Sequence, residues 1–331
     1  MTDWRSLHGD SFQGRTVLIT GGTGFIGSHI AQACIALGAS VTVLDDLSGS
    51  SVDNLDSFRE QAGDRLRFVE GSILDTDALD QCCRDVDYVF HQGALPSVPR
   101  SIEHPVMFNE VNVTGTVNVL EAARRAHVRR VMFAASSSAY GDSPTLPKVE
   151  TMPPLPKSPY AANKLAGEHL MRAYASCYDI DTVSLRYFNI FGPRQNANSV
   201  YSGVIAIFAK RLINGEPVTI NGEGFSRDFT YVDNAVHANL LAARCDRPLK
   251  GEVFNVACGK AVTIFDLAVT MARALGKAHL QPIVGPERAG DVKHSLADIS
   301  AAGRAFGYEP IVEFEPGLEQ TMAWYQAALV P

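Results

Sequence analysis

The stretch Thr20-Gly21-Gly22-Thr23-Gly24-Phe25-Ile26-Gly27 (TGGTGFIG), close to the start of the chain, decides the fold. It contains both G-x-G-x-x-G, starting at Gly22, and G-x-x-G-x-x-G, starting at Gly21. Glycines in such a turn let backbone N–H groups approach a pyrophosphate, and the following helix adds its dipole. Gly27 permits close packing of that helix against the strand. A glycine pattern alone is weak, but this one stands between a predicted strand and a predicted helix.

The segments around this loop predict alternating strands and helices. Thr16–Thr20 (TVLIT) is typical of a buried strand, and residues 27–37 carry apolar residues at helical spacing up to Gly38. Further apolar runs predict strands at 41–44, 66–69, 88–91, 131–135 and 182–187, with the longest helical segments at about 106–126 and 159–178. Apolar strands separated by helices predict an α/β fold with a doubly wound parallel sheet of the Rossmann type, covered on both faces.

The second half of the chain is less regular. Segments 144–157 and 189–203 are rich in Pro, Ser and Asn and are predicted to be loops over the mouth of a site. The C-terminal part mixes predicted helices, at about 264–275 and 315–329, with short strands. We expect this part to cover a substrate and to interleave with the dinucleotide-binding part.

The composition is that of an ordinary globular protein, with 46% hydrophobic and 20% charged residues. The net charge of −7 leaves no basic footprint for nucleic acid, so an anionic ligand must be held by local donors. Residues 1–14 lack the apolar core of a signal peptide, no apolar run reaches the roughly 20 residues of a membrane helix, and the six cysteines show no C-x-x-C spacing. We expect a cytoplasmic protein with reduced thiols, no metal, no nucleic acid and no membrane partner.

The second predicted strand ends in Asp45-Asp46. A carboxylate at this place in a dinucleotide-binding unit accepts hydrogen bonds from the adenosine ribose hydroxyls and would repel a 2′-phosphate, which favours NAD over NADP. The alternative is a turn with two solvated acids. With the glycine loop in place we favour the cofactor role, and Asp45 is the better candidate.

Tyr160 and Lys164 stand four residues apart in the stretch YAANK. On a helix they share one face, and Ser158 with Pro159 suits the start of that helix. An ammonium and a cationic nicotinamide beside a phenol stabilise the phenolate, so Tyr160 could act as a general base at neutral pH. The spacing alone is a weak motif, because a surface tyrosine and lysine on an amphipathic helix give the same pattern.

The predicted strand 131–135 runs into the stretch SSSAYG, which starts at Ser136. Hydroxyls at the carboxyl end of a central strand lie where an open α/β sheet binds its ligand. A serine there can bind a sugar hydroxyl and relay its proton to Tyr160. The alternative is a serine-rich turn without a function.

Together these motifs resemble the extended short-chain dehydrogenases/reductases, and among them the NAD-dependent epimerase/dehydratase family. The stretches RYFN from Arg186, RDFTYV from Arg227 and RAGD from Arg288 add to the resemblance, which runs from about residue 16 to 325. The stretches AASSSAYGDSP, LRYFNIFGPRQ and GDVKHSLADIS are most similar to the branch of bacterial UDP-N-acetylglucosamine 4-epimerases.

The resemblance implies which residues contact cofactor and substrate. The catalytic residues would be Tyr160, Lys164 and Ser136. Cofactor contacts would come from Gly21, Gly24, Phe25, Ile26, Gly27, Asp45, Asp46, Ser72, Ile73, Gln92, Ala94, Tyr160, Lys164 and Tyr187. Substrate contacts would come from Ser97, Ser137, Ser138, Asn189, Val204, Asn221, Arg227, Arg288, Asp291 and Ser295. Among these, Asn189, Arg227 and Arg288 would hold the diphosphate, and Asp291 the uridine ribose.

The same resemblance implies a reaction and an organisation. Tyr160 would take the proton of the sugar 4′-hydroxyl while C4′ passes hydride to tightly bound NAD, and hydride would return to the other face of the 4-keto sugar. Residues 1–188, with 233–258 returning to them, would form the NAD-binding domain. Residues 189–232 and 259–331 would form a smaller C-terminal α/β domain for the nucleotide sugar. The helices at 106–126 and 159–178 would pair in a homodimer, with a monomer as the alternative.

Several other activities share this scaffold. Sugar 4,6-dehydratases resemble one another in an Asp-Glu pair directly after the catalytic Ser/Thr, where this chain has Ser137 and Ser138, so we favour 4-epimerisation. UDP-glucose 4-epimerase and UDP-glucuronate 4-epimerase or decarboxylase remain alternatives. So does a non-enzymatic NAD-sensing regulator, although such proteins typically lose the tyrosine and lysine present here as Tyr160 and Lys164.

Two positions refine these expectations. Ser295 aligns with the family's gatekeeper beside the sugar C2 substituent, and a small residue there resembles enzymes that admit an N-acetyl group, which favours UDP-GlcNAc and UDP-GalNAc. Ser72 stands where the family usually has an Asp that contacts adenine, so we expect a lower NAD affinity unless Asp75 substitutes. His91 is expected to line the cofactor pocket without catalysing.

Overall fold

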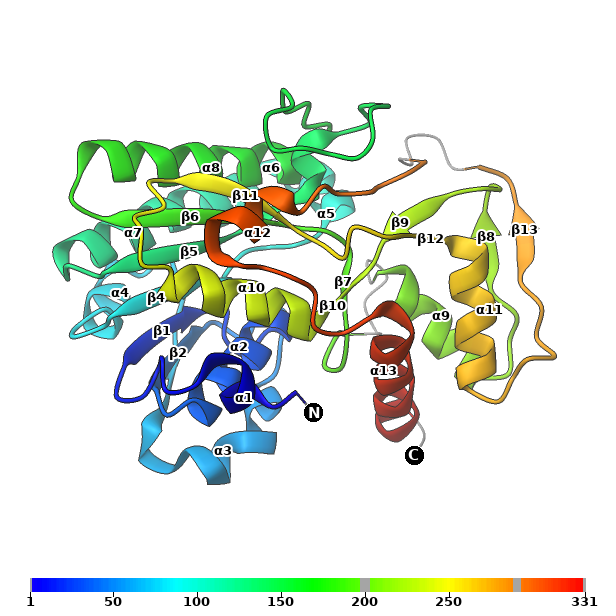
Figure 1. Cartoon of the computed structure of the whole chain (residues 1–331), viewed down its shortest axis with the longest axis horizontal. Helices are drawn as coiled ribbons and strands as arrows, with labels where there is room; N and C mark the ends of the chain where they lie inside the picture. The colour runs from blue at the N-terminus through cyan, green and yellow to red at the C-terminus, as the bar shows by residue number, and fades with distance from the viewer. Residues whose placement is uncertain (1, 197–202, 288–292, 330–331) are drawn as a thin grey trace.

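Seven parallel strands form the central sheet of the computed structural model, which describes residues 2–196, 203–287 and 293–329. The strand order is β11-β6-β5-β4-β1-β2-β3 (Figure 1). The strands are β1 Thr16–Thr20, β2 Ser40–Asp45, β3 Leu66–Glu70, β4 Tyr88–His91, β5 Arg130–Ser136, β6 Asp181–Tyr187 and β11 Glu252–Val256. The strand order reverses at β1, which lies between β2 and β4, and this confirms the predicted doubly wound sheet.

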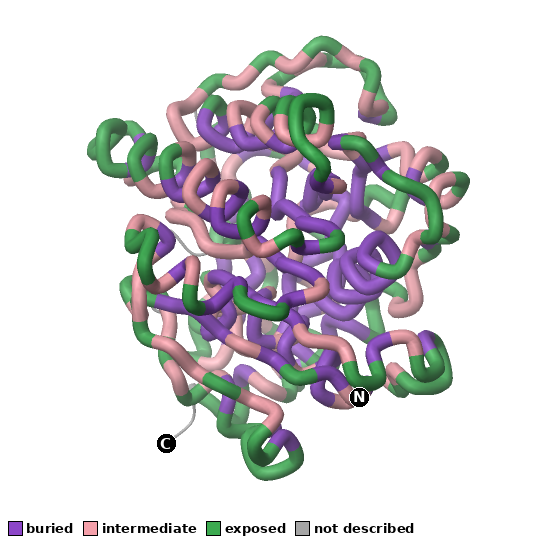
Figure 2. Tube along the Cα trace, turned by 90° about the vertical axis from the view of Figure 1, so that its left-hand side faces the viewer, coloured by how far each residue is buried: buried purple, intermediate pink, exposed green. Residues whose placement is uncertain are grey.

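Both faces of this sheet are buried, because successive side chains on a strand point to opposite sides. In β1, Val17 and Ile19 join one hydrophobic core, whereas Leu18 between them joins the other. One face is covered by α2 (Phe25–Ala36), α10 (Val232–Arg244) and α12 (Ser300–Phe306); the other by α4 (Thr76–Cys82), α7 (Gly115–Arg125) and α8 (Pro159–Cys177). Figure 2 shows the buried residues gathered in the middle of the molecule.

The predicted long helix at 106–126 is interrupted in the structure. α6 (Pro105–Asn109) runs into a π-helical turn, Glu110–Thr114, before α7 begins, and a further helix, α5 (Val98–Glu103), precedes them. From the π-helical turn, the Asn112 amide accepts from the Leu95 N–H at 2.8 Å and donates to the Leu95 carbonyl at 3.1 Å. The widened turn thus fastens the loop after β4, a tertiary contact that helical periodicity does not reveal.

A second, smaller core lies beside the sheet, at the right of Figure 1. α9 (Val204–Ile213), α11 (Ile264–Ala274) and α13 (Phe314–Leu329) pack there around Phe191 and Phe229. Three two-stranded sheets belong to this side: β7 (Ile190–Phe191) with β10 (Thr230–Tyr231), β8 (Thr219–Asn221) with β13 (Ile283–Gly285), and β9 (Ser226–Asp228) with β12 (Ala261–Thr263). The domain boundaries given above stay a prediction.

The predicted loops differ in outcome. Residues 144–157 contain one isolated bridge, at Lys148, and no helix or strand, which agrees with the prediction. In the segment 189–203, of which residues 197–202 lie outside the described residues, β7 pairs with β10. This strand is not predicted because two residues leave no readable alternation in a sequence. The helices α1 (Trp4–His8) and α3 (Asp56–Ala62) also escape prediction, because so few residues show no helical periodicity in a sequence.

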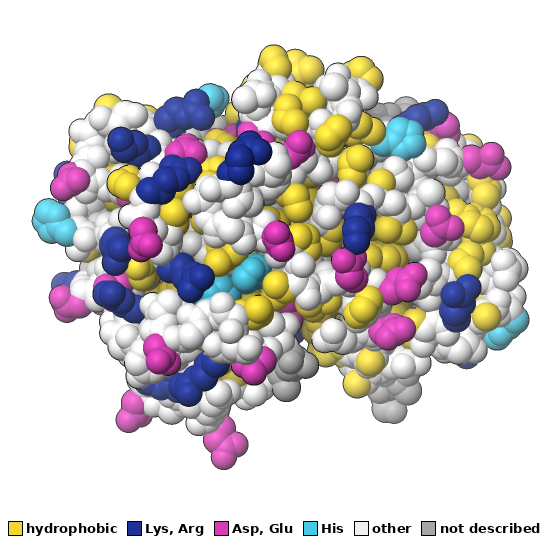
Figure 3. All heavy atoms as spheres, in the orientation of Figure 1, with side chains coloured by type: hydrophobic (Ala, Val, Ile, Leu, Met, Phe, Trp, Pro, Cys, Tyr) yellow, Lys and Arg dark blue, Asp and Glu magenta, His cyan; other side chains and the backbone are white. Residues whose placement is uncertain are grey.

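Within the described ranges, no helix combines the length and the apolar character needed to cross a membrane. Acidic and basic side chains are interspersed over the face that Figure 3 shows. That pattern agrees with the small net charge of −7 and with the absence of a basic footprint in the sequence.

Candidate active site

The glycine loop connects the end of β1 to the start of α2. The N-terminal end of the helix consists of Gly24 as the N-cap, Phe25 and Ile26. Gly21 has a φ of +65°, and a Cβ there would lie 2.7 Å from the Cα of Gly93. A Cβ on Gly27 would lie 2.2 Å from the carbonyl oxygen of Gly21, so the helix approaches the loop more closely than any other residue would allow. The loop has the close packing and the helix N-terminus that suit a dinucleotide pyrophosphate.

Asp45, at the end of β2, is buried against this loop. Its Oδ2 accepts from the Thr23 N–H at 3.1 Å, and its Oδ1 accepts from the Leu47 N–H at 3.0 Å. The Asp46 carboxylate is exposed and accepts from the Ser48 N–H at 3.0 Å. Of the two acids, Asp45 is therefore the one that lies beside the glycine loop, where a carboxylate can reach an adenosine ribose.

The segment after β3 replaces the usual acid by a hydroxyl. The Ser72 Oγ accepts from the Leu74 N–H at 3.2 Å. The Asp75 Oδ1 accepts from the Ala78 N–H at 3.0 Å and so caps the N-terminus of α4. Ile73 is buried, and a Cβ on Gly115 would lie 2.6 Å from its Cδ1, so it packs against the start of α7. Position 72 therefore carries a hydroxyl and no charge.

His91 has a structural environment. Its Nδ1 lies 2.7 Å from the Thr20 Oγ1 and its Nε2 lies 3.0 Å from the Thr116 Oγ1, so the ring joins β4 to β1 and α7. Burial lowers the pKa of His91 to about 3, which keeps the imidazole neutral. The residues that follow it, Gln92, Gly93 and Ala94, are partly exposed beside the glycine loop.

Tyr160, Lys164 and Ser136 meet at the carboxyl end of β5. α8 begins at Pro159 with Ser158 as its N-cap, as the sequence predicts, and places Tyr160 in its first turn. The Tyr160 hydroxyl lies near Ser136, the last residue of β5, and this serine acts to lower the pKa of Tyr160. The Lys164 Nζ donates to the carbonyl oxygen of Ala134, two residues earlier on the same strand, at 2.8 Å.

The protein's own groups set the electrostatics of this cluster. Burial raises the pKa of Tyr160 above its ordinary value, and the neighbouring Ser136 acts in the opposite direction. Burial lowers the pKa of Lys164 to about 7. In the protein alone Tyr160 is therefore a neutral phenol at neutral pH, and a cation beside it would favour the phenolate.

We expect Lys164→Met to gain in thermal stability over the parent as the pH falls from 10 to 6. The folded-state pKa of Lys164 is about 7 and its ordinary value is 10.5, so between them the unfolded chain binds more protons. The lysine's contribution to stability is full above the ordinary value and is lost as the pH falls through about 7. Calorimetry across this range measures the difference in Tm between variant and parent. A difference that does not change with pH would contradict the lowered pKa of Lys164.

Four further serines lie on the elements next to this cluster. Ser137 begins a 3-10 turn, Ser137–Tyr140, and the N–H and Oγ of Ser138 both donate to the Ser136 Oγ, at 3.2 and 2.8 Å. The Ser97 Oγ accepts from the Arg100 N–H at 3.3 Å and caps α5. The neighbouring Ser101 Oγ accepts from the Tyr160 N–H at 3.1 Å, so α5 is tied to the start of α8.

The structure brings two predicted substrate residues into direct contact. Asn189 has a φ of +41°, and its Nδ2 donates to the Ser295 Oγ and to the Asp228 carbonyl, each at 3.0 Å. A positive φ is uncommon for a non-glycine residue, and asparagine is among the residues that adopt it most readily. The Arg227 guanidinium donates to the carbonyls of Ser226 and Lys293, at 2.9 and 3.1 Å.

Of the four remaining predicted substrate residues, two lie beside the second core and two lie outside the described residues. Val204 begins α9 and Asn221 ends β8, so both belong to elements of the second core. Arg288 and Asp291 lie outside the described residues.

One buried acid, Asp228, escapes the sequence prediction. Its Oδ1 accepts from the Cys258 N–H at 3.0 Å, and its Oδ2 accepts from the N–H groups of Gly259 and Ala297 at 3.0 and 3.1 Å. Burial raises the pKa of Asp228 to about 6, against the lowering effect of these hydrogen bonds. The signal in the sequence is an acid inside the apolar run of RDFTYV.

The loop 144–157 is hydrogen-bonded to the segment that carries Ser295. The Lys148 N–H donates to the Leu296 carbonyl at 2.7 Å, and the Asp298 N–H donates to the Lys148 carbonyl at 2.9 Å. On the other side, the Ser295 N–H donates to the Ser226 carbonyl at 3.1 Å. The segment that carries Ser295 is therefore held between this loop and β9.

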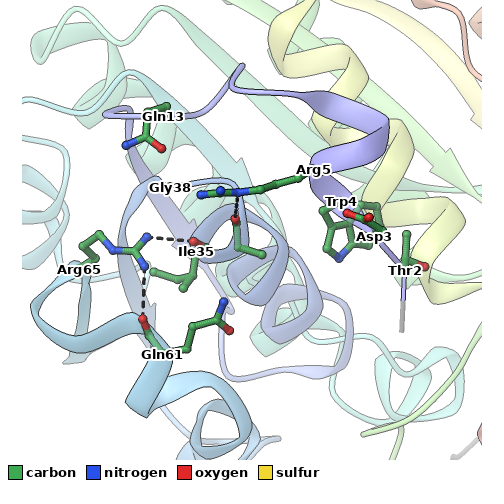
Figure 4. Close-up of a pocket in the computed structure, with 10 residues that line it drawn as sticks. Thr2, Asp3, Trp4, Arg5, Gln13, Ile35, Gly38, Gln61 and Arg65 are labelled. Atoms are coloured by element: carbon green, nitrogen blue, oxygen red, sulfur yellow. Dashed lines mark hydrogen bonds between the residues drawn. The ribbon is translucent and has the colours of Figure 1, made fainter.

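A surface depression lies at the C-terminal end of α2, the end opposite the glycine loop (Figure 4). It is lined by polar residues that include Thr2, Gln13 and Gln61. The Arg5 Nε donates to the Ala36 carbonyl at 3.3 Å, and Arg65 donates to the Ile35 carbonyl at 2.9 Å. Both guanidinium groups thus donate to carbonyls at the C-terminus of α2, about 18 Å along the 12-residue helix from the glycine loop.

Nothing in residues 2–196, 203–287 and 293–329 groups three or more His, Cys, Asp or Glu side chains in a way that could hold a metal ion.

Comparisons with known proteins agree with this geometry. A sequence model of the NAD dependent epimerase/dehydratase family matches residues 17–257. A UDP-glucose 4-epimerase from Mycolicibacterium smegmatis is 37% identical over 313 residues, which cover 93% of this chain and 98% of that protein. A UDP-N-acetylglucosamine 4-epimerase from Methanobrevibacter ruminantium M1, solved with UDP-N-acetylmuramic acid, has a TM-score of 0.90, 38% identity, and coverage of 96% and 99%. The UDP-glucose 4-epimerase of Thermus thermophilus, solved with NAD, has a TM-score of 0.83, 36% identity, and coverage of 95% and 99%.

Proposed function

This chain belongs to the NAD-dependent epimerase/dehydratase family, and we propose that it interconverts the 4-epimers of a UDP-hexose, with UDP-GlcNAc and UDP-GalNAc as the preferred pair. The observation that carries the proposal is the meeting of Tyr160, Ser136 and Lys164 at the carboxyl end of β5. In a doubly wound sheet, the crevice at the carboxyl ends of the strands is where a ligand binds. Relatives named as UDP-sugar 4-epimerases support the reaction.

In this proposal, one set of residues transfers the proton and another set binds the dinucleotide. Bound NAD would supply a hydride acceptor and donor for the sugar C4, and a positive charge beside the Tyr160 phenol. Tyr160 would then take the proton of the sugar 4-hydroxyl, and the neighbouring Ser136 would hold that hydroxyl and relay its proton. Lys164, anchored on the Ala134 carbonyl, adds a cation whose charge depends on pH near neutrality. Asp45 and the glycine loop bind and orient the dinucleotide.

Dehydration of the sugar is disfavoured by the residues after Ser136. Elimination of water from the sugar needs a further acid and base close to the reacting carbons. Ser137 and Ser138 stand there, and the Ser138 hydroxyl is used in a hydrogen bond to Ser136. Neither residue can supply a carboxylate, which favours simple return of hydride to the keto sugar.

The sugar preference rests on Ser295. It is a small residue, and its hydroxyl accepts a hydrogen bond from Asn189, which we propose as a diphosphate-binding residue. This contact puts Ser295 in the wall of the substrate site in our proposal. A short side chain there leaves room for an N-acetyl group at the sugar C2.

We expect Ser295→Tyr to lower kcat/KM for UDP-GlcNAc by about 100-fold and to leave kcat/KM for UDP-glucose within a few-fold. The phenol ring would fill the space of the N-acetyl group, whereas the glucose 2-hydroxyl still fits. Ser295→Ala is the matched control, because it removes the acceptor for Asn189 but keeps the space. Equal losses for both sugars in Ser295→Tyr would refute the gatekeeper role.

The proposed function is tested by an NMR time course of the purified protein with UDP-GlcNAc, run without added cofactor, then with NAD⁺, and then with UDP-glucose. Formation of UDP-GalNAc establishes the proposed reaction. Formation of UDP-galactose alone keeps 4-epimerisation and overturns the sugar preference. Conversion only after addition of NAD⁺ would reflect weak cofactor retention, in line with Ser72 in place of an acid. No conversion of either sugar would refute the proposal and direct the search to uronic-acid sugars.

A further inference from the structure

A line of three polar side chains runs from the interior of the protein to the glycine loop. Asn239, in α10, is fully buried, and its Nδ2 lies 2.8 Å from the carbonyl oxygen of Ala235 and 2.7 Å from the hydroxyl oxygen of Tyr187. The Tyr187 hydroxyl lies 3.2 Å from the Oε1 of Gln92. Three distant parts of the chain, α10, the end of β6 and the loop after β4, are joined by these contacts.

The Ala235 carbonyl determines the direction of each hydrogen bond in this line. A backbone carbonyl such as that of Ala235 can only accept, so the Asn239 atom beside it must be the amide nitrogen. That nitrogen can only donate, which makes the Tyr187 oxygen an acceptor at this contact. The Tyr187 hydrogen is then directed to Gln92, whose contacting atom must be the amide oxygen. Burial raises the pKa of Tyr187 to about 12, so the hydroxyl keeps this hydrogen throughout the neutral range.

The Tyr187 contact thus fixes which atom of the Gln92 amide is the acceptor and leaves Nε2 as the donor. The Gln92 Nε2 is buried and has no hydrogen-bond acceptor among the described residues. The backbone of Gln92 adjoins the glycine loop, because a Cβ on Gly21 would lie 2.9 Å from the Gln92 carbonyl carbon. The Asn239 Oδ1 is likewise buried without a donor in the described parts of the chain, so the protein leaves one polar atom unpaired at each end of the line. An unpaired buried polar group destabilises a protein, so each of these two atoms calls for a partner such as a ligand, an ion or a water.

We propose that Asn239 and Tyr187 are positioning residues for the cofactor, which hold the Gln92 amide so that its N–H₂ group donates to an oxygen of the bound dinucleotide. Tyr187 then acts through Gln92. The proposal rests on NAD as the cofactor of the family and is independent of which sugar the protein converts.

The test reverses the direction of the line and measures NAD⁺ binding. In Asn239→Asp at pH 8.5, the carboxylate accepts from Tyr187, the Tyr187 oxygen accepts from Gln92, and the Gln92 amide turns its oxygen toward the cofactor. We expect the Kd of NAD⁺, measured by calorimetry on the full-length protein freed of cofactor, to rise about tenfold, the effect of losing one hydrogen bond. Gln92→Glu removes the donor directly and should raise the Kd by at least as much.

A double-mutant cycle separates positioning from general damage to the fold. In the Tyr187→Phe background no hydroxyl transmits the reversal, so adding Asn239→Asp should leave the Kd of NAD⁺ unchanged. The same fold-change in both backgrounds, or a lower Tm of Asn239→Asp with an unaltered Kd, would overturn the proposal. If Asn239→Asp does not fold, the Kd of Gln92→Glu decides, because an unchanged value excludes a Gln92 donor. Sugar conversion enters none of these measurements, so their failure is distinct from failure of the proposed reaction.

Discussion

Tyr160→Phe should lower kcat for epimerisation of the UDP-sugar by about 10³-fold, within the range that proton transfer by one positioned side chain contributes. The substitution removes only the phenolic oxygen, which lies near Ser136 at the end of β5. Without it, no group of matched position takes the proton of the 4-hydroxyl as hydride leaves. Steady-state kinetics with UDP-GlcNAc and UDP-glucose measures the loss.

A second tyrosine of the same region provides the matched control. Tyr140 is buried, and its hydroxyl donates to the Asn255 Oδ1 at 2.7 Å. Tyr140→Phe should therefore lower the Tm, because the Asn255 oxygen loses its donor, and change kcat much less than Tyr160→Phe does. If Tyr160→Phe keeps kcat within tenfold of the parent, Tyr160 is not the base.

Glu168→Leu should cost about 3–5 kcal/mol of the free energy of unfolding, the range for a buried ion pair that loses one partner. Glu168, in α8, accepts from the Arg186 Nε and Nη2 at 2.8 and 2.7 Å, and both side chains are only 4% exposed. The substitution leaves the Arg186 guanidinium buried without its counter-charge. Because this pair fastens α8 to β6, the helix that carries Tyr160 loses an anchor at the same time.

Two comparisons make this result interpretable. The double variant Glu168→Leu/Arg186→Met should recover most of the loss, because it leaves neither charge buried alone. Glu313→Gln breaks the exposed pair of Glu313 and Lys260, whose side chains are 64% and 66% exposed, and should leave the denaturant midpoint almost unchanged. A small effect of Glu168→Leu, comparable with that of Glu313→Gln, would mean that the buried pair contributes little.

Features coded within a few consecutive residues were predictable from the sequence. The glycine loop between strand and helix and the strand Thr16–Thr20 need only local patterns. The start of α8 at Pro159 with Ser158 as its cap is also local, because a cap and its helix are neighbours in the chain. The π-helical turn Glu110–Thr114 was not predictable, since it depends on the contact of Asn112 with a loop 17 residues away.

The sequence by itself thus determined the family, the doubly wound fold and the identity of the catalytic candidates, because motif spacing and apolar periodicity are properties of short segments. Only the tertiary structure decided how those candidates are held. Asp228 joins segments far apart in the chain, Ser295 lies against Asn189 at a separation of 106 residues, and Asn239 orients Tyr187 across 52. Hydrogen-bond direction and burial arise only when the folded chain brings an acceptor to a donor, and no local pattern specifies that pairing.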